Sequence, residues 1–330
     1  MEHFLACYLE QFNSVPRNSL HDRRKRYDMV DYISTLIEAC REKNEEPEDA
    51  ANEAVTHLID YHEKMRSTNS NVCLMGKYHN ILYVALKLCY LWQLKNTKTI
   101  ASLLDKIYAC EKTFERLFIG AIFGNKAPHF IAGWKSDFDD QEENLRAVVY
   151  FLDRANKACL NYCFSDDIIY RFIDVPIENC GKSSPVKIVT QLGLPDKLLI
   201  FLRYGASIYN EEDDGNPIEI IMKRLLEFNH VYPFTLVACL QILLRVTPTV
   251  KFRHLDDSVT TQSYIEENYA ELVSDAILPI TRCGVIPPDL KHICRCVIRD
   301  KMMENYQLPI GIKALPIPYN LQRYIDILED

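Results

Sequence analysis

Between Ser183 and Asn210 the chain reads SSPVKIVTQLGLPDKLLIFLRYGASIYN, and the turn residues of this stretch allow few folds. Pro185 opens an apolar run, and a helix tolerates proline at its start because the missing N–H has no helical partner there. Gly193 separates this run from a second one. Gly205 follows the second run, where glycine readily takes the left-handed conformation that ends a helix. The spacing predicts two short helices whose apolar face packs on neighbouring pairs.

Apolar residues recur at helical spacing through much of the remaining chain, so we expect an all-α protein. Two helices are expected within residues 27–66, joined by an acidic loop, two more within residues 80–110, and a further pair at residues 113–123 and 142–158. The run DGNPIEIIMKRLL places Pro217 at 32 residues after Pro185 (217 − 185), close to the 33-residue period of one class of helical repeat.

The stretch from Ser183 resembles an ankyrin repeat. Ser184-Pro185-Val186-Lys187 stands where that repeat has T-P-L-H, and Gly205-Ala206 closes its second helix. The resemblance gives Pro185, Gly193 and Gly205 structural roles in the repeat. Lys187 replaces the usual histidine, which puts the usual hydrogen bonds between repeats in doubt. The remaining repeats are degenerate, and an irregular helical bundle that imitates one repeat is the alternative.

Two motifs lie close together near residue 330. Residues 288–303 read PDLKHICRCVIRDKMM, in which we expect Asp289 to cap a helix. One face of this helix is apolar, and its members are Leu290, Ile293, Cys294, Val297 and Ile298. The other side is basic, with Lys291, Arg295 and Arg299.

The second motif is LPIPYNLQRY, residues 315–324. Each proline forces the residue before it into an extended conformation, so Leu315 and Ile317 should present their side chains at little entropic cost. Pro318 can open a last helix. The apolar stripe of that helix comprises Leu321, Tyr324, Ile325 and Leu328.

In this order and at this spacing, the two motifs resemble a SOCS box of about 40 residues. Its elongin-binding half has the form L-x-x-x-C-x-x-x-apolar, which here corresponds to Leu290, Cys294 and Ile298. The position before the leucine is usually Ser, Thr, Ala or Pro, and Asp289 departs from that pattern. The resemblance implies that elongin C contacts Leu290, Ile293, Cys294, Val297 and Ile298. The cullin-binding half has the form L-P-x-P-x-x-L-x-x-Y, which implies that cullin-5 contacts Leu315, Pro316, Ile317, Pro318, Leu321 and Tyr324.

An ankyrin-like body followed by a SOCS box is similar to the ankyrin-repeat and SOCS-box family, in a repeat-poor form. The expected fold is all-α: a degenerate ankyrin-type stack of helical pairs with a C-terminal three-helix SOCS box. The expected domains are a helical region at 1–75, ankyrin-like repeats at 76–283 and the SOCS box at 284–330. The resemblance implies a substrate receptor of a ubiquitin ligase, bound to elongin B, elongin C, cullin-5 and its RING partner, that recruits an unknown protein substrate.

The alternative of another class is an ankyrin-type scaffold without a ligase role. An enzyme with an unrecognised helical fold is less favoured, because the sequence contains no GxSxG, phosphate-binding glycine loop, HExxH or Rossmann fingerprint. We therefore expect a non-catalytic protein without cofactors.

Net charge and hydropathy limit the kinds of partner and the cellular location that we expect. The net charge of −8 argues against a general nucleic-acid binder. The basic run His21 to Arg26 reads as a solvated helix start, with a localisation signal or a phosphate contact as alternatives. The first residues lack the pattern of a signal peptide, and no apolar run reaches the roughly 18 residues of a membrane span. We expect an intracellular protein of the cytoplasm or nucleus.

The twelve cysteines have irregular spacing. Neither Cys159-x3-Cys163 nor Cys294-x-Cys296 combines with nearby histidines into a four-ligand zinc pattern. Reduced, buried thiols and no metal are the expectation from sequence.

Overall fold

The computed structural model describes residues 2–41, 46–124, 127, 137–165, 168–209, 216–252 and 260–330. The chain forms two compact units, residues 1–169 and 170–330, which are described separately. Within the described residues there are fifteen α-helices and one two-stranded sheet, formed by β1 (Asn161–Ser165) and β2 (Ile168–Arg171). The predicted all-α class is therefore confirmed. The division at residues 75 and 283 remains a prediction.

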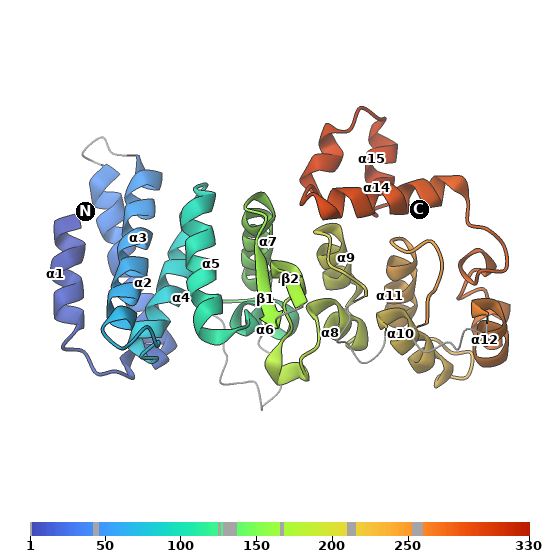
Figure 1. The fold of residues 1–330 in the computed structure, drawn as a ribbon, viewed down its shortest axis with the longest axis horizontal. Helices are drawn as coiled ribbons and strands as arrows, with labels where there is room; N and C mark the ends of the chain where they lie inside the picture. The colour runs from blue at the N-terminus through green and yellow to red at the C-terminus, as the bar shows by residue number, and fades with distance from the viewer. Residues whose placement is uncertain are drawn as a thin grey trace. The chain divides into compact units, whose positions relative to one another are not determined.

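The first unit is a succession of helices that pack on one another (Figure 1). The helices are α1 (Glu2–Phe12), α2 (Arg23–Arg41), α3 (Pro47–Ser67), α4 (Lys77–Leu91), α5 (Thr97–Glu111), α6 (Glu115–Phe123) and α7 (Gln141–Lys157). Three pairs, α2 and α3, α4 and α5, and α6 and α7, occupy the three predicted segments. Residues 42–45 of the predicted acidic loop lie outside the described residues. Neither α1 nor the β1–β2 sheet was predicted, because their short runs carry no strong period.

Helix α4 lies at the centre of this unit, in contact with α2, α3 and α5. Ile81, Leu82, Val84 and Leu88 are fully buried. Residues 81–89 are all buried, which explains most of the apolar run of residues 81–94, since a helix surrounded by other helices has no solvated face there. None of the helices in the described residues is both long and apolar enough to cross a bilayer.

The basic run at residues 21–26 has a structural role in the first unit. Arg26 is 5% exposed, and its Nε donates to Asp137 Oδ1 at 2.5 Å. Arg23 donates to the hydroxyl of Tyr27 at 2.6 Å and to the carbonyl of Phe138 at 2.6 Å. The interpretation of this run as a solvated helix start is therefore wrong for Arg26, because its charge pairs with a carboxylate 111 residues away.

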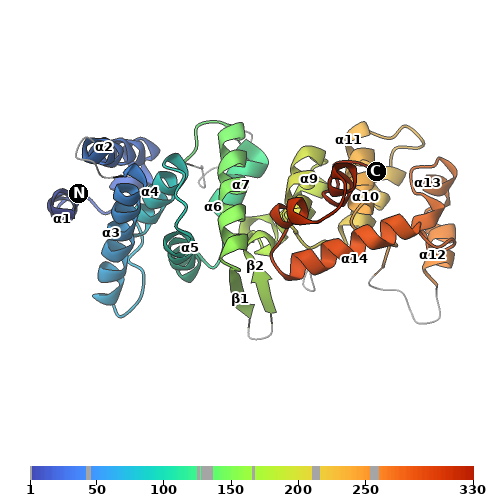
Figure 2. The same ribbon diagram turned by 90° about the horizontal axis from the view of Figure 1, so that it is seen from above.

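The second unit contains eight of the described α-helices: α8 (Pro185–Gln191), α9 (Pro195–Arg203), α10 (Pro217–Leu226), α11 (Phe234–Leu244), α12 (Thr261–Asn268), α13 (Ala270–Ser274), α14 (Leu290–Glu304) and α15 (Tyr319–Ile325). A 3-10 helix, η7 (Ile310–Ala314), lies between the last two. Helix α8 pairs with α9, and α10 with α11. The pairs stack because α8 contacts α10 and α9 contacts α11 (Figures 1 and 2). This arrangement is the predicted stack of helical pairs.

Both pairs begin in the same way. The hydroxyl of Ser184 accepts from the N–H of Lys187 ahead of Pro185, and the side chain of Asn216 accepts from Ile218 ahead of Pro217. A capping oxygen before a first-turn proline satisfies N–H groups that have no partner within the helix. The local sequence therefore sets where each pair starts.

Two glycines give the turns of the first pair their geometry. Gly193, between α8 and α9, has φ +67°, and Gly205, after α9, has φ +83°. L-residues rarely adopt these values, so glycine is favoured at both positions.

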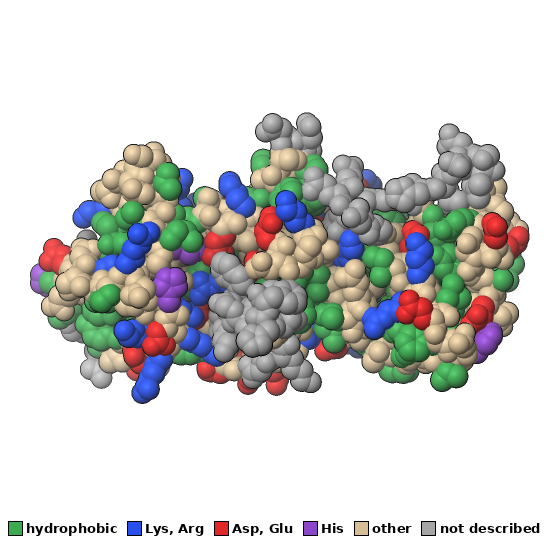
Figure 3. Space-filling model, turned by 90° about the horizontal axis from the view of Figure 1, so that it is seen from below, with side chains coloured by type: hydrophobic (Ala, Val, Ile, Leu, Met, Phe, Trp, Pro, Cys, Tyr) green, Lys and Arg blue, Asp and Glu red, His purple; other side chains and the backbone are tan. Residues whose placement is uncertain are grey.

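On the face drawn in Figure 3, lysine and arginine side chains are interspersed with aspartates and glutamates.

Candidate functional site: the C-terminal helices

Helix α14 turns its basic side inward. Arg295 and Arg299 are 2% and 4% exposed, and His292 on the same side is also buried. Leu290 is 75% exposed and Val297 is 54% exposed. A helix that packs by its apolar face would show the reverse pattern. The apolar face is therefore left available, and hydrogen bonds from the polar side hold the helix in place.

Arg299 makes the central contact of this packing. One guanidinium nitrogen donates to the carbonyl of Leu202 at 2.5 Å, and another donates to the carbonyl of Ile325 at 2.9 Å. These carbonyls belong to the last turns of α9 and α15, where the helix dipole is negative. The carbonyl of Leu202 also accepts from the backbone N–H of Gly205 at 3.0 Å. Burial lowers the pKa of Arg299 to about 10. The two carbonyl contacts compensate for part of the cost of burying this charge.

His292 and Arg295 continue the same polar seam. His292 Nε2 lies 2.9 Å from the carbonyl of Thr247, and Arg295 donates to His292 Nδ1 at 2.9 Å. Both contacts are made together only when the ring is neutral with its proton on Nε2. Burial lowers the pKa of His292, and Arg282 and Arg295 lower it further, which favours this neutral form.

The side chain of Tyr324 lies beneath two cations of α14. Lys291 Nζ is 3.9 Å from the centre of its ring, and the Arg295 guanidinium carbon is 4.1 Å away. Cation–π contacts of this kind add to the packing of the ring. Tyr324, which the family resemblance assigns to cullin binding, is only 8% exposed and holds α15 against α14.

The apolar side of α14 divides into an exposed part and a half-buried part. Leu290, Cys294 and Val297 are exposed at spacings of four and three residues, and we call them the α14 stripe. Ile298 packs instead on the small core of Leu308, Ile312 and Ile325, and Ile293 is also half-buried. The structure thus separates the predicted elongin residues into two groups.

The LPIP segment packs more closely than predicted. Leu315 is extended, with φ −67° and ψ 134°, as the following proline requires. However, the side chains of Leu315 and Ile317 pack on the Leu308, Ile312 and Ile325 core and are only partly exposed. The exposed groups are Pro316, Pro318 and Tyr319, the last of which is 70% exposed.

Gln322 holds this segment against α15. Its amide donates to the carbonyls of Leu315 and Ile317 at 3.1 and 3.3 Å. Pro318 precedes the first residue of α15, in agreement with the predicted helix start. Leu321 on the same helix is half-buried.

Salt bridges tie the end of the chain to the helical pairs. Arg203 binds both carboxylate oxygens of Asp326 at 3.0 and 2.6 Å. Arg245 reaches the carboxylate of Asp330 at 2.9 Å and the carbonyl of Ile327 at 3.0 Å. The sequence did not single out either arginine, because each is far from its partner along the chain.

Asp289 occupies the predicted position at the start of α14, but its side chain caps no backbone N–H. The predicted capping role is therefore wrong. His292 and Ile293 instead donate through their backbone N–H groups to the carbonyl of Asp289.

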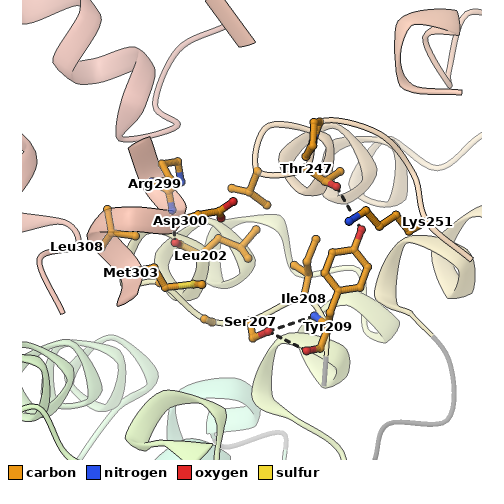
Figure 4. Close-up of a pocket in the computed structure, with 14 residues that line it drawn as sticks. Leu202, Ser207, Ile208, Tyr209, Thr247, Lys251, Arg299, Asp300, Met303 and Leu308 are labelled. Carbon is orange, nitrogen blue, oxygen red and sulfur yellow. Dashed lines mark hydrogen bonds between the residues drawn. The ribbon is translucent and has the colours of Figure 1, made fainter. Parts of the chain in front are cut away.

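A pocket lies behind α14, between the end of α9 and residues 246–251 (Figure 4). Arg299 and Asp300 line it from α14, and Tyr209 and Lys251 line it from the stack. The hydroxyls of Tyr209 and Thr247 lie 3.2 Å apart there. The pocket is on the polar side of α14, away from the α14 stripe.

Comparison with known proteins agrees with this arrangement. The model of the SOCS box family matches residues 286–326, the segment that contains α14, η7 and α15. The chain therefore contains a SOCS-box segment that follows its stacked helical pairs.

The chain is similar to ankyrin repeat and SOCS box protein 17 of Canis lupus familiaris and of Bos taurus, with 30% identity over 155 residues in each case. The protein of that name from Homo sapiens is 26% identical over 155 residues. Each match covers 44% of this chain and 49% of the relative, so the chain spans about half the length of the curated relatives it matches. No solved structure matches. The resemblance to the ankyrin-repeat and SOCS-box family is confirmed.

Proposed function

We propose that this protein is the substrate-recognition subunit of an elongin B/C–cullin-5 RING ubiquitin ligase. The observation that carries the proposal is the α14 stripe, in which apolar side chains point to solvent while the polar side of the same helix is buried. An isolated exposed leucine needs no explanation, but an exposed apolar helix face within a matched SOCS box favours a partner.

The partner of the α14 stripe would be elongin C. Leu290 would be the central anchor, since its side chain is 75% exposed, and Cys294 and Val297 would continue the contact along the helix. Docking of an amphipathic helix in an apolar groove uses residues at this spacing. Because α14 is already folded and fixed by Arg299, little conformational entropy would be lost on binding.

Cullin-5 would contact the other end of the box. Pro316, Pro318 and Tyr319 form its exposed part, and the underlying Leu315 and Ile317 hold it in shape. Tyr324 would then act as a support rather than a contact. The chain would contribute no catalytic residue, because bringing a bound target close to the charged ubiquitin-conjugating enzyme supplies the rate enhancement.

The target protein would bind outside the SOCS box. Residues 284–330 contain six Lys and Arg and six Asp and Glu, so the net charge of −8 lies in residues 1–283. A body with this charge favours a partner with basic surface.

The test is affinity purification of the tagged full chain from cells. Wild-type protein should capture elongins B and C and cullin-5, and the double variant Leu290→Asp, Cys294→Arg should lose all three while keeping its target. Lys301→Ala is the matched control, because Lys301 is exposed on the same helix outside the stripe. Capture of elongins by the double variant would contradict the proposal and favour the ankyrin-type scaffold.

A further inference from the structure

Four side chains that commonly ligate metals converge in the first unit, far along the chain from the SOCS box. His62 lies on α3, Cys73 in the connection to α4, His79 in the first turn of α4 and Cys110 near the end of α5. One ligand atom of each lies within 4.8 Å of the ligand atoms of the other three. Two imidazoles and two thiols form one of the common ligand sets of structural zinc sites.

The distances match those of a tetrahedral site. His62 Nε2 lies 3.6 Å from the sulfur of Cys73 and 3.5 Å from the sulfur of Cys110. With Zn–S of about 2.3 Å and Zn–N of about 2.0–2.1 Å, a nitrogen and a sulfur ligand of one zinc ion are about 3.5 Å apart. The protein thus holds these atoms at the spacing that the ion requires.

The orientation of His79 indicates a ligand. Its Nε2 contacts the carboxylate of Glu111 at 2.6 Å, whereas its Nδ1 is buried with no hydrogen-bond partner in the described part of the chain. Tyr83 donates to the other oxygen of Glu111 at 2.6 Å and so fixes the carboxylate. A histidine that binds a metal through one nitrogen and a carboxylate through the other has this arrangement. His62 differs, because it faces the two sulfurs with Nε2.

The environment of Cys73 favours a thiolate. The N–H of Met75 donates to its sulfur at 3.4 Å. A divalent ion would bind Cys73 and Cys110 as thiolates, since metal ligation requires deprotonated thiols.

We propose that His62, Cys73, His79 and Cys110 bind one Zn²⁺ ion in a structural, tetrahedral site. Four protein ligands leave no open position for substrate, which argues against a catalytic role. The ion would hold α3 and α5 against α4, the central helix of the unit. Thiolate and imidazole ligands favour zinc over calcium or magnesium. The intervals between ligands, of 10, 5 and 30 residues, match no short motif, so the sequence did not reveal the set.

The first experiment measures zinc in the purified full chain by mass spectrometry after gel filtration in metal-free buffer. We expect one zinc per chain, and loss of zinc from Cys73→Ser and from Cys110→Ser. Cys159→Ser is the control, because Cys159 is an exposed cysteine of the same unit outside the cluster. Glu111→Gln should weaken zinc binding by about 10- to 100-fold, as for other residues that orient a ligand.

The second experiment uses wild-type protein, so it does not depend on the folding of a variant. Cys73 and Cys110 should resist alkylation in the zinc-loaded chain and become reactive after chelation, as mapped by peptide mass spectrometry. Cobalt substitution should give absorption bands of tetrahedral intensity with thiolate charge transfer. Zinc content well below one per chain with reactivity unchanged by chelator would overturn the proposal. So would a Cys73–Cys110 disulfide in protein that binds no zinc.

Discussion

Arg299 of α14 donates a hydrogen bond to the carbonyl of Leu202 in the last turn of α9, across 97 residues of sequence. This contact determines which side of α14 faces outward. With the guanidinium held at the end of α9, the opposite face, which includes Leu290, is exposed. The orientation of the proposed elongin surface therefore depends on a buried arginine that would not itself touch elongin.

Replacing Arg299 should loosen the SOCS box. Arg299→Leu leaves the carbonyl of Ile325 without its donor, and a buried unsatisfied group costs about 1–3 kcal/mol. It also removes one of the two donors to Leu202, whose carbonyl still accepts from the N–H of Gly205. We expect the free energy of unfolding of the second unit to fall by roughly 2–4 kcal/mol. Chemical denaturation measures this, with the exposed Lys301→Leu as control. A stability equal to wild type would refute the anchoring role.

Substitution of Leu290 should affect binding to elongin C, whereas substitution of Ile298 should affect the stability of the fold. Leu290→Ala should leave the melting temperature unchanged but weaken elongin C binding by on the order of 2–4 kcal/mol, as for a central apolar anchor. Ile298→Ala should lower stability by about 2–4 kcal/mol, because Ile298 packs on the Leu308 core. Calorimetric titration with elongin B/C and thermal melting of both variants provide the comparison. Equal effects of the two substitutions on elongin affinity would contradict the division of this face.

The prolines of the LPIP segment should affect cullin-5 and spare the elongins. The double variant Pro316→Ala, Pro318→Ala frees Leu315 and Ile317 from the extended conformation. Each freed residue should reduce the binding free energy by about 0.5–1 kcal/mol through lost preorganisation. With lost contacts at the exposed rings, affinity for cullin-5 should fall by roughly tenfold or more. The measurement is titration of the cullin-5 N-terminal domain into purified ternary complexes. Loss of elongins from the variant would show that the segment instead maintains the box.

Gly205 and Gly181 form a matched pair for measuring close packing. Both have positive φ, +83° and +70°. A Cβ at Gly205 would lie 3.3 Å from Met303 Cγ and 3.4 Å from Leu308 Cδ1, whereas one at Gly181 meets nothing within 4 Å. Gly205→Val should lower the free energy of unfolding by roughly 1 kcal/mol through backbone strain, and by more through this crowding. Gly181→Val should lower it through backbone strain alone. Equal melting temperatures for the two variants would argue against tight packing of the box on α9.

His292 should make the second unit less stable in mild acid. Its folded pKa is below the ordinary value of 6.5, so the unfolded chain binds the proton more readily. The stability provided by the neutral ring is thus present above about pH 6.5 and is lost as pH falls through and below that value. NMR titration of the His292 ring should give a pKa below 6.5. A pKa at or above 6.5 would contradict the proton arrangement between Arg295 and Thr247.

The spacing of apolar residues, prolines and glycines was sufficient to predict the elements near the site. Pro185 and Pro217 start helices at the expected positions, and Gly205 ends one. These features are local, because capping, the missing N–H of proline and the freedom of glycine act within one helical turn. The SOCS motif could be recognised for the same reason, since its residues lie within one short stretch.

The tertiary structure decided how these elements are used. The amphipathic pattern of α14 is compatible with burying either face, and the outcome depends on carbonyls at the ends of α9 and α15 that accept from Arg299. Likewise, Tyr324 became a buried support because Lys291 and Arg295 cover its ring. Contacts between residues far apart in sequence leave no periodic signal. The sequence by itself therefore determined the helices and the motif, and only their packing determined which side chains remain free to meet a partner.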